Sequence, residues 1–320
     1  MCYSALVWAD YRRYVRAFGA ELNIAEFYDI FWRRTKSNPK INIPKSMEAA
    51  FAEPKNELER QIKGLIDEFA AGRALKLQQE LFKQRTRLAD LQRVLSVRST
   101  KAAAEGKRIA TDKIEWVLGK LSDLERTEPT DEDSRIFPAH YAPVMVFEDG
   151  KRVIKPMRYH CRPAGKPALH DARFPGTYNA RRDSLERFWK DQFGYSHGLL
   201  VTNSFYENVN RHRVEGRELR PHEKEENVIL EFRPRPPQDM LVACLWSKWT
   251  GPGEPDLISF AAITDEPPSE VFAAGHDRCI IPIRPENIDA WLSPDPKNLA
   301  AQYAILDDRE RPYYEHRMAA

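Results

Sequence analysis

The sequence has few cysteines and no long apolar run, and these shortages exclude several classes of protein. Its 320 residues include 4 cysteines. They are widely scattered, with no C-x-x-C pair and no Cys/His run at zinc spacing, so neither a structural zinc site nor a disulfide framework is expected. No stretch is apolar enough to cross a bilayer, and the N-terminus lacks the basic-then-apolar layout of a signal peptide. We therefore expect a cytoplasmic protein without a membrane partner.

The chain also lacks an excess of charge of either sign. Lys and Arg number 50 against 48 Asp and Glu, so composition does not indicate a nucleic-acid binder, and any such surface must be a local patch. Hydrophobic residues make up 42% and charged residues 31%, with 23 prolines. This composition is typical of a globular body with long loops and an exposed helical part. A chain of this length can bury a substantial core.

The helical part is predicted between residues 46 and 126. Leucine and isoleucine recur at helical spacing from Leu58 to Leu95, with charged and polar residues between them, which predicts a long amphipathic helix. A turn is expected at residues 104–107, followed by a second helix up to about Leu124. The segment is thus expected to be a helical hairpin. It could bind a protein partner, associate with a second copy, or grip nucleic acid, although a charged helix face is most often only solvated.

Short strands between Pro- and Gly-rich turns are predicted for the remainder of the chain. The expected strands are Ala142–Glu148, Arg152–Met157, Gly198–Thr202, Val228–Phe232, Met240–Trp246, Ile258–Thr264 and Cys279–Ile283. Helices are expected over Arg182–Gln192 and Ile288–Leu292. The pattern indicates an α+β fold with mainly antiparallel pairing and flanking helices.

Cys2 is the first residue with distinctive chemistry. Once Met1 is removed, Cys2 carries an α-amine and a thiol on adjacent carbons. The amine condenses with an aldehyde to an imine, and the thiol then closes on the imine carbon to give a thiazolidine, an intramolecular second step. Both groups have ordinary pKa values of about 8 to 8.5, within reach of their reactive forms at neutral pH. On base rates alone, Cys2 is an inert small residue.

Three later stretches also carry candidate site residues. Asn179-Ala180-Arg181 follows a Pro-Gly turn and suits hydrogen bonding and phosphate contact. An apolar strand leads to Glu207, whose carboxyl would have a raised pKa against aromatic neighbours and could transfer a proton. His276-Asp277-Arg278 places an imidazole beside a guanidinium. Taken singly, each is more often a surface acid, a salt-bridge partner or a core histidine.

Taken together and in this order, these stretches resemble the SRAP family, the SOS-response-associated peptidases, whose members crosslink themselves to abasic sites in DNA. The matching motifs are Cys2, Asn179-Ala180-Arg181, Ser204–Asn208 and His276–Ile280. The resemblance implies an antiparallel β core of SRAP type, formed by residues 1–45 and 127–320, with the helical hairpin 46–126 as an insertion.

The resemblance also implies roles for individual residues. Cys2 attacks the sugar aldehyde of an abasic site in single-stranded DNA, and Glu207 is the acid and base. His276 stabilises charge on the sugar oxygen, and Asn179 orients the N-terminal residue. Arg181 and Arg278 hold phosphates, and Tyr159 stands where the family has a base-stacking tryptophan. No metal or cofactor is implied, self-cleavage and lyase activity accompany the family, and DNA would bring the protein to the nucleoid.

The sequence departs from the family pattern at several positions and leaves two alternatives open. The chain begins Cys2-Tyr3-Ser4 where the family has Cys-Gly-Arg, and Asn208 stands where the family has a tryptophan. One alternative is a thiol peptidase or amidase with Cys2 as nucleophile and His276 as base. The other is a non-catalytic scaffold of SRAP type whose helical arm recruits a partner.

Overall fold

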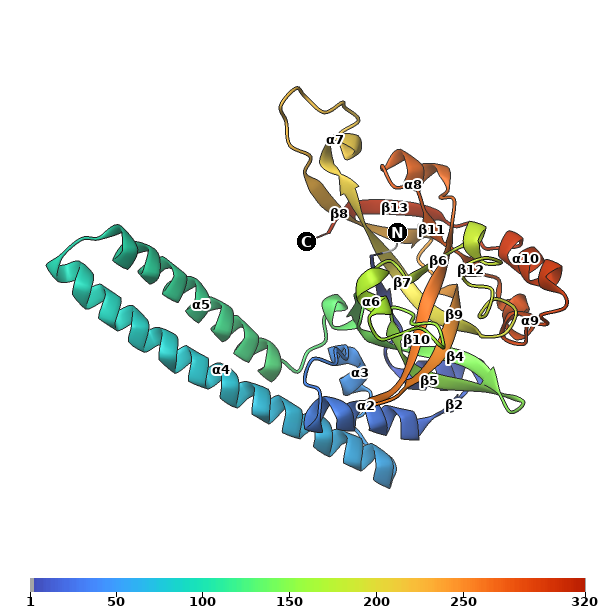
Figure 1. Ribbon diagram of the computed structural model, residues 1–320, viewed down its shortest axis with the longest axis horizontal. Helices are drawn as coiled ribbons and strands as arrows, with labels where there is room; N and C mark the ends of the chain where they lie inside the picture. Colours follow the sequence, from blue (N-terminus) through green and yellow to red (C-terminus); the bar gives the residue numbers. More distant parts are fainter. Residues whose placement is uncertain (1–2, 320) are drawn as a thin grey trace. The chain divides into compact units, whose positions relative to one another are not determined.

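The structure is a computed structural model that describes residues 3–319, and the chain divides into two compact units (Figure 1). The smaller unit consists of Phe31–Pro39 and Pro54–Thr130, and the other described residues form the larger unit. The observed division differs from the expected one at three places. Residues 46–53 belong to the larger unit, and residues 31–39 and 127–130 belong to the smaller one. All three segments were expected in the other unit.

The larger unit is built on one mixed sheet. Its strands are β1 (Ser4–Val7), β2 (Glu21–Leu22), β3 (Arg135–Ile136), β4 (Tyr141–Glu148), β5 (Lys151–Tyr159), β6 (Asn179–Arg181), β7 (His197–Asn210), β8 (Asn227–Arg235), β9 (Met240–Gly251), β10 (Glu254–Asp265), β11 (Cys279–Ile280), β12 (Pro282–Ile283) and β13 (Tyr313–Met318). Each of the longer predicted strands lies within one of these. The segment predicted as a single strand over Cys279–Ile283 is divided into β11 and β12.

The long strand β7 organises the sheet. The main path runs β12-β9-β10-β5-β4-β7-β1-β3, and β7 also pairs with β8 and β9. Most pairings are antiparallel, and the parallel ones join β10 to β5 and β6, and β2 to β5. The predicted α+β fold with mainly antiparallel pairing is therefore confirmed. β7 is bordered on both sides and most of its residues are buried, which accounts for the apolar run Leu199–Val201 in its first half.

Buried polar contacts fix the N-terminal helix against this sheet. Tyr14 is fully buried, and its hydroxyl donates to the carbonyl oxygen of Pro143 at 3.2 Å and accepts from the N–H of Val201 at 3.0 Å. Burial raises the pKa of this phenol well above its ordinary value. Asp10 caps the helix by accepting from the N–H of Arg12. Tyr14 thus ties the first helix of the chain to β4 and β7, and Asp10 caps the start of the same helix.

The α-helices are mostly short outside the smaller unit. They are α1 (Tyr11–Phe18), α2 (Ile24–Lys36), α3 (Lys45–Ala49), α4 (Glu57–Val97), α5 (Lys101–Glu125), α6 (His170–Arg173), α7 (Arg211–Val214), α8 (Ser269–Ala273), α9 (Ile288–Leu292) and α10 (Leu299–Asp307). The 3-10 helices are η1 (Asp131–Ser134), η2 (Arg182–Ser184) and η3 (Pro285–Asn287). The predicted helix Ile288–Leu292 is confirmed as α9.

The predicted helix Arg182–Gln192 is wrong beyond its first turn. Only η2 is regular, and consecutive turns follow it. The prediction placed Asp183 or Ser184 near the helix start, and Leu185, Trp189 and Phe193, which are four apart in the sequence, are all buried. Their backbone hydrogen bonds are irregular, however: the N–H groups of both Arg187 and Trp189 donate to the carbonyl of Ser184. Packing of these three side chains into the core overrides the helical hydrogen-bond pattern.

The smaller unit contains the predicted helical hairpin, in which α4 and α5 lie antiparallel and side by side (Figure 1). The side chains of Asn56 and Thr100 cap the two helices by accepting from backbone N–H groups three residues on. The turn lies at residues 98–100, so its prediction at residues 104–107 is wrong. Gly106 lies inside α5, where a Cβ would come within 3.1 Å of Leu91. Gly106 allows the two helices to approach closely, and it does not form a turn.

No described helix is both long and apolar enough to span a membrane.

Candidate active site

Glu207 and His276 form the centre of the candidate site. Glu207 lies on β7 and is fully buried, and His276 lies between α8 and β11 and is 8% exposed. The distance from His276 Nε2 to Glu207 Oε2 is 3.2 Å, which is within reach of proton transfer. Two residues that are 69 positions apart in the sequence are therefore brought together, as the sequence analysis required. A hydrogen bond from the His276 N–H to the carbonyl of Val271 ties the imidazole-bearing loop to α8.

Burial shifts both groups toward their neutral forms. It raises the pKa of the Glu207 carboxyl well above its ordinary value of 4.5, and it lowers the pKa of the His276 imidazole from 6.5 to about 4. In each case removal from water penalises the charged form. At neutral pH the imidazole is therefore neutral, and the carboxyl holds its proton to a higher pH than an exposed glutamate does.

The contacts of the imidazole indicate where its proton lies. His276 Nδ1 is 2.9 Å from the carbonyl oxygen of Arg278, which only accepts, and 3.3 Å from the N–H of the same residue, which only donates. The two contacts favour opposite tautomers, and the shorter one favours a ring proton on Nδ1. Nε2 of the neutral ring is then an acceptor facing Glu207. A protonated Glu207 carboxyl can donate to it, which agrees with the raised pKa of that carboxyl. The pair thus presents a carboxylic acid positioned by an imidazole.

The described chain begins beside this pair. Tyr3 N–H donates to the carbonyl of Tyr206 at 3.2 Å, and the same strand continues with Ser4 opposite Tyr206 on β7. A hydrogen bond from the Tyr3 backbone also acts on the Glu207 carboxyl. Tyr3, the first described residue, therefore lies next to Glu207. Cys2, the predicted nucleophile, lies outside the described residues.

A cavity of about 430 Å³ adjoins His276. Its other lining residues come from α7 with the loop after it and from the end of α8, and they include Arg213, Phe272 and Gly275. Phe272 is 68% exposed at this cavity. Gly275 has φ +96°, and a Cβ there would lie 3.1 Å from the Cβ of Arg213, so the close approach of α7 to the His276 loop requires glycine.

Arg213 and Phe272 were missed by the sequence analysis. The available signal for Phe272 was an aromatic residue four positions before His276. It lies on the polar side of a helix of only five residues. Arg213 gave no usable signal, because its place beside His276 depends on the packing of α7 against Gly275, which is distant in sequence. Two further cavity residues, Arg217 and Glu218, lie on the same loop, and Arg217 is already paired with Glu223 at 2.6 Å.

Asn179 and Arg181 lie on β6, at one edge of β10. Asn179 pairs with Ala262 and Arg181 with Thr264, while Ile280 of β11 pairs with the same Thr264 from the other edge. The Asn179–Arg181 segment and the segment after His276 therefore flank the last residues of β10. Asn179 is buried, with 6% exposure. Arg181 is half exposed and binds Asp183 through two contacts of 3.1 and 2.6 Å.

Arg278 contributes to the site mainly through its backbone. Its carbonyl accepts the His276 Nδ1 hydrogen bond. Its guanidinium is 3.7 Å from Asp277, and the side chain is 16% exposed. Arg278 thus holds the tautomer of His276 and retains part of its guanidinium at the surface.

The expectation that Tyr159 stacks on a DNA base is wrong, because Tyr159 is 2% exposed. Its ring stacks on Phe260 at a centroid distance of 5.2 Å, and its hydroxyl lies 3.5 Å from Asn179 Oδ1. Burial leaves neither ring face open to a nucleotide. The following His160 has φ 148°, a backbone conformation that favours glycine. Tyr159 is a core residue that supports Asn179.

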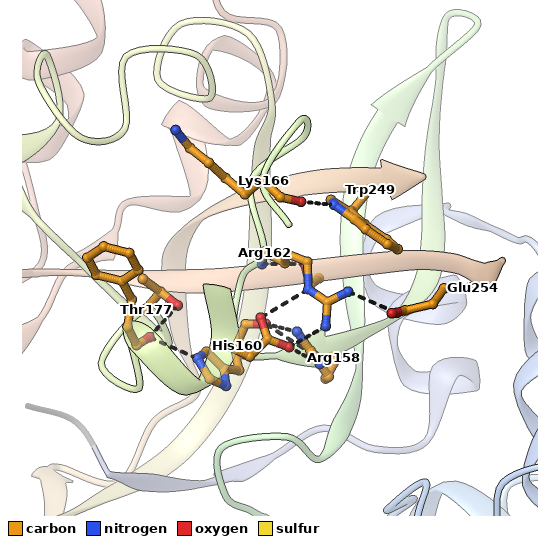
Figure 2. Close-up of polar contacts among 10 residues, drawn as sticks. Arg158, His160, Arg162, Lys166, Thr177, Trp249 and Glu254 are labelled. Carbon is orange, nitrogen blue, oxygen red and sulfur yellow. Dashed lines mark hydrogen bonds and ion pairs between the residues drawn. The ribbon is translucent and has the colours of Figure 1, made fainter. Parts of the chain in front are cut away.

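A buried ionic network holds the same segment in place (Figure 2). Arg162 donates two hydrogen bonds to Asp171, at 3.1 and 2.6 Å, and Arg158 reaches the same carboxylate at 2.8 Å. Figure 2 also shows Arg162 joined to Glu254, and the guanidinium lies 4.5 Å from the centre of the Trp249 ring. These contacts anchor the loop between β5 and β6, and they therefore position the strand that carries Asn179.

No group of three or more His, Cys, Asp or Glu side chains suited to a metal ion occurs within residues 3–319. The described cysteines are buried, and burial raises the pKa of Cys161 to about 12. These thiols are therefore poor nucleophiles and poor ligands at neutral pH.

The fold and site define an α+β protein with a buried carboxyl–imidazole pair at an open cavity, an arrangement suited to acid–base chemistry. The family model described as SOS response associated peptidase (SRAP) matches residues 50–318. The chain belongs to this family. By its name, the family is tied to the response to DNA damage and to peptidase chemistry.

Three solved structures are similar to part of this chain. A Bordetella bronchiseptica protein is 15% identical, with a TM-score of 0.46 over 58% of this chain and 87% of that chain. A Bacteroides thetaiotaomicron protein is 14% identical, with a TM-score of 0.45 over 58% and 78%. A phage-related protein from Bordetella bronchiseptica is 19% identical, with a TM-score of 0.43 over 58% and 81%. No curated protein matched the chain.

Proposed function

We propose that the protein forms a covalent crosslink with abasic sites in single-stranded DNA, through the α-amine and thiol of Cys2 after removal of Met1. The observation that carries this proposal is the 3.2 Å contact between buried Glu207 and His276 beside the cavity. The position of Tyr3, the first described residue of the chain, adds support, because its N–H is hydrogen-bonded to Tyr206, the neighbour of Glu207.

The reaction begins at the open-chain aldehyde of the abasic sugar. The amine nitrogen of Cys2 adds to the aldehyde carbon, which gives a carbinolamine. Glu207 transfers its proton to the carbinolamine hydroxyl, which leaves as water, and an iminium forms. The iminium nitrogen then returns its proton to the Glu207 carboxylate, which leaves a neutral imine and restores the acid. The Cys2 sulfur then bonds to the same carbon while the thiol proton moves to nitrogen, and the thiazolidine ring closes. No oxidant, reductant or metal is consumed in these steps.

The side chains around the pair serve this chemistry through position and charge. His276 accepts from the Glu207 carboxyl and keeps its proton aimed, because the opposite ring nitrogen is held by the carbonyl of Arg278. Arg213 contacts a phosphate beside the lesion, and exposed Phe272 stacks on the neighbouring unpaired base. Asn179 orients the N-terminal residue, and Arg181 holds a second phosphate by exchanging its contact with Asp183.

A gel assay tests the proposal. Purified protein is incubated with a labelled single strand that contains one abasic site and is resolved under denaturing conditions, with Met1 removal verified by mass spectrometry. We expect a heat-stable shifted band that Cys2→Ser abolishes and that the matched thiol variant Cys161→Ala retains, because the Cys161 thiol is buried. Absence of a shifted band from the wild type across salt and pH would exclude the crosslinking function.

A second candidate, favoured by the family's description as a peptidase, is cleavage of peptide bonds by the Cys2 thiol, including release of its own leader. The Cys2→Ser variant separates the two functions. A serine hydroxyl retains measurable acyl transfer but forms no stable thiazolidine. Peptide hydrolysis that survives in Cys2→Ser while the DNA band is lost would assign a peptidase activity in addition to the crosslink.

A further inference from the structure

One face of the helical hairpin is centred on Trp116. A surface cavity of about 390 Å³ is lined by Glu80 of α4 and by Lys113, Trp116 and Val117 of α5. Val117 is fully buried and closes the floor, while Trp116 is 58% exposed. The cavity therefore marks the side of the hairpin on which α4 and α5 meet at the surface. All four residues belong to the smaller unit.

Helical periodicity extends this flank into two rows of basic side chains. On α4, residues four before, three after and seven after Glu80 share its face. On α5, residues three before and four after Trp116 share its face. We call the resulting surface the Trp116 face. It consists of Lys76, Lys83, Arg87, Lys113, Trp116 and Lys120.

The cations of the Trp116 face are not neutralised by their surroundings. Within residues 3–319, none of its five basic side chains forms an ion pair, and Glu80 is the one acid among these helical positions. The Glu80 carboxylate accepts a hydrogen bond from Gln84 at 2.7 Å. Two other arginines of the hairpin are paired: Arg93 binds Asp90, and Arg108 binds both Glu105 and Asp112. The five cations of the Trp116 face are therefore available to a ligand, and they share this face with one exposed indole ring.

We propose that the Trp116 face binds single-stranded nucleic acid. A large flat ring exposed between lysines three residues before and four residues after it can stack on an unpaired base, while the flanking cations contact phosphates. An intact duplex offers phosphates but no free base face, so a single strand uses both parts of this surface. An acidic protein segment would use the charges and leave the ring without a specific role.

This binding does not rest on the proposed crosslink, because an undamaged strand carries no aldehyde. Its test therefore uses full-length protein and undamaged, fluorescently labelled oligothymidylate, with affinity measured by anisotropy over a range of salt concentrations. A failure of the crosslinking reaction leaves this measurement unchanged.

The key comparison is between two double variants of equal charge. K83Q/K113Q removes two cations of the Trp116 face, and R85Q/K107Q removes two exposed, unpaired cations that lie about 160° and 120° around their helices from Lys83 and Lys113. We expect K83Q/K113Q to weaken binding at least fivefold at low salt and to lower the slope of log affinity against log salt by about 1.4. R85Q/K107Q is expected to keep most of the wild-type affinity and most of the salt slope. Equal effects of the two variants would overturn the proposal.

Trp116 provides a second and independent readout. We expect W116A to weaken strand binding at least fivefold and W116F to weaken it less, with helix content unchanged by circular dichroism. Competition by the same oligonucleotide as a duplex, by polyglutamate and by anionic vesicles completes the test. Effective competition by polyglutamate or vesicles, or a W116A variant that binds like the wild type, would overturn the assignment to a nucleic-acid strand.

Discussion

Two carboxyl groups of this protein, the half-buried Asp171 and the fully buried Glu207, are held in opposite ways. Burial alone would raise the pKa of Asp171, but the hydrogen bonds from Arg162 and Arg158 outweigh it and lower that pKa to about 2. The pKa of Glu207 is instead raised well above its ordinary value, because burial dominates and its neighbour His276 is a neutral imidazole. Asp171 is a permanently charged clamp, whereas Glu207 is an acid that keeps its proton.

The two acids therefore have different roles: Asp171 supports the structure, and Glu207 is suited to the chemistry. The Asp171 network fixes the loop that leads to Asn179 (Figure 2). The Glu207 pair adjoins an open cavity and the start of the described chain. An acid whose proton is available near neutral pH is useful for dehydrating a carbinolamine, and a carboxylate locked between two arginines is not. Replacing Glu207 by its amide should therefore lower activity and not stability, and replacing Asp171 by its amide should lower stability more than activity.

The largest effect is expected from Glu207→Gln. An amide cannot supply the proton, so the single-turnover crosslinking rate at pH 7 should fall by about 10²- to 10³-fold. The thermal midpoint should stay the same or rise, because a neutral amide replaces a buried group that is costly to ionise. A variant that loses stability in proportion to its activity would show that Glu207 has only a structural role.

Asp171→Asn should change stability more than chemistry. Removing the charge leaves Arg158 and Arg162 buried with less compensation, so the free energy of unfolding should drop by about 3 kcal/mol. Asp183→Asn, which breaks the exposed pair with Arg181, is the matched control and should cost below about 1 kcal/mol.

The difference in unfolding free energy between wild type and Asp171→Asn should depend on pH in one direction. The folded pKa of Asp171 is about 2 against an ordinary 3.8. Its stabilisation is therefore fully present above about pH 4 and is lost as pH falls toward 2. Denaturant titrations of wild type and Asp171→Asn should converge over that range. A gap that stays constant down to pH 2 would refute the ionic account of Asp171.

Smaller effects are expected at the cavity. Phe272→Ala should weaken binding of an abasic single strand about five- to tenfold, because one stacked base is worth about 1 to 3 kcal/mol. Tyr195→Ala removes an aromatic residue of similar exposure, 64%, from the turn before the other end of β7. It should leave the affinity unchanged. Equal losses in the two variants, measured by anisotropy, would remove Phe272 from the DNA-binding surface.

Much of the larger unit could be predicted from sequence, because its strands are apolar runs bounded by turn residues. The helical hairpin was predictable for the same kind of reason, a sustained helical periodicity. Its turn was misplaced because Gly106 resembles a turn residue, whereas its role is a contact with Leu91. The helix at Arg182 failed because buried Trp189 and Phe193 mimic helical spacing without helical hydrogen bonds.

The site was predictable only in part. Motif order brought forward Glu207 and His276, and the structure brings those two into contact. Tyr159 was assigned to the surface because its position in the motif was considered without its burial, which depends on packing against Phe260. Phe272 escaped notice because an exposed aromatic residue near His276 carries no motif of its own, and Arg213 because it meets the His276 loop only through packing against Gly275, some sixty positions further along the chain.

The most direct test of the account is the pH dependence of the single-turnover crosslinking rate for wild type and Glu207→Gln on a single strand with one abasic site. The wild-type rate should rise as the Cys2 amine loses its proton and fall at higher pH as Glu207 loses its own, and the fall should be absent from Glu207→Gln. Profiles of the same shape and height for the two proteins would contradict the assignment of Glu207 as the acid.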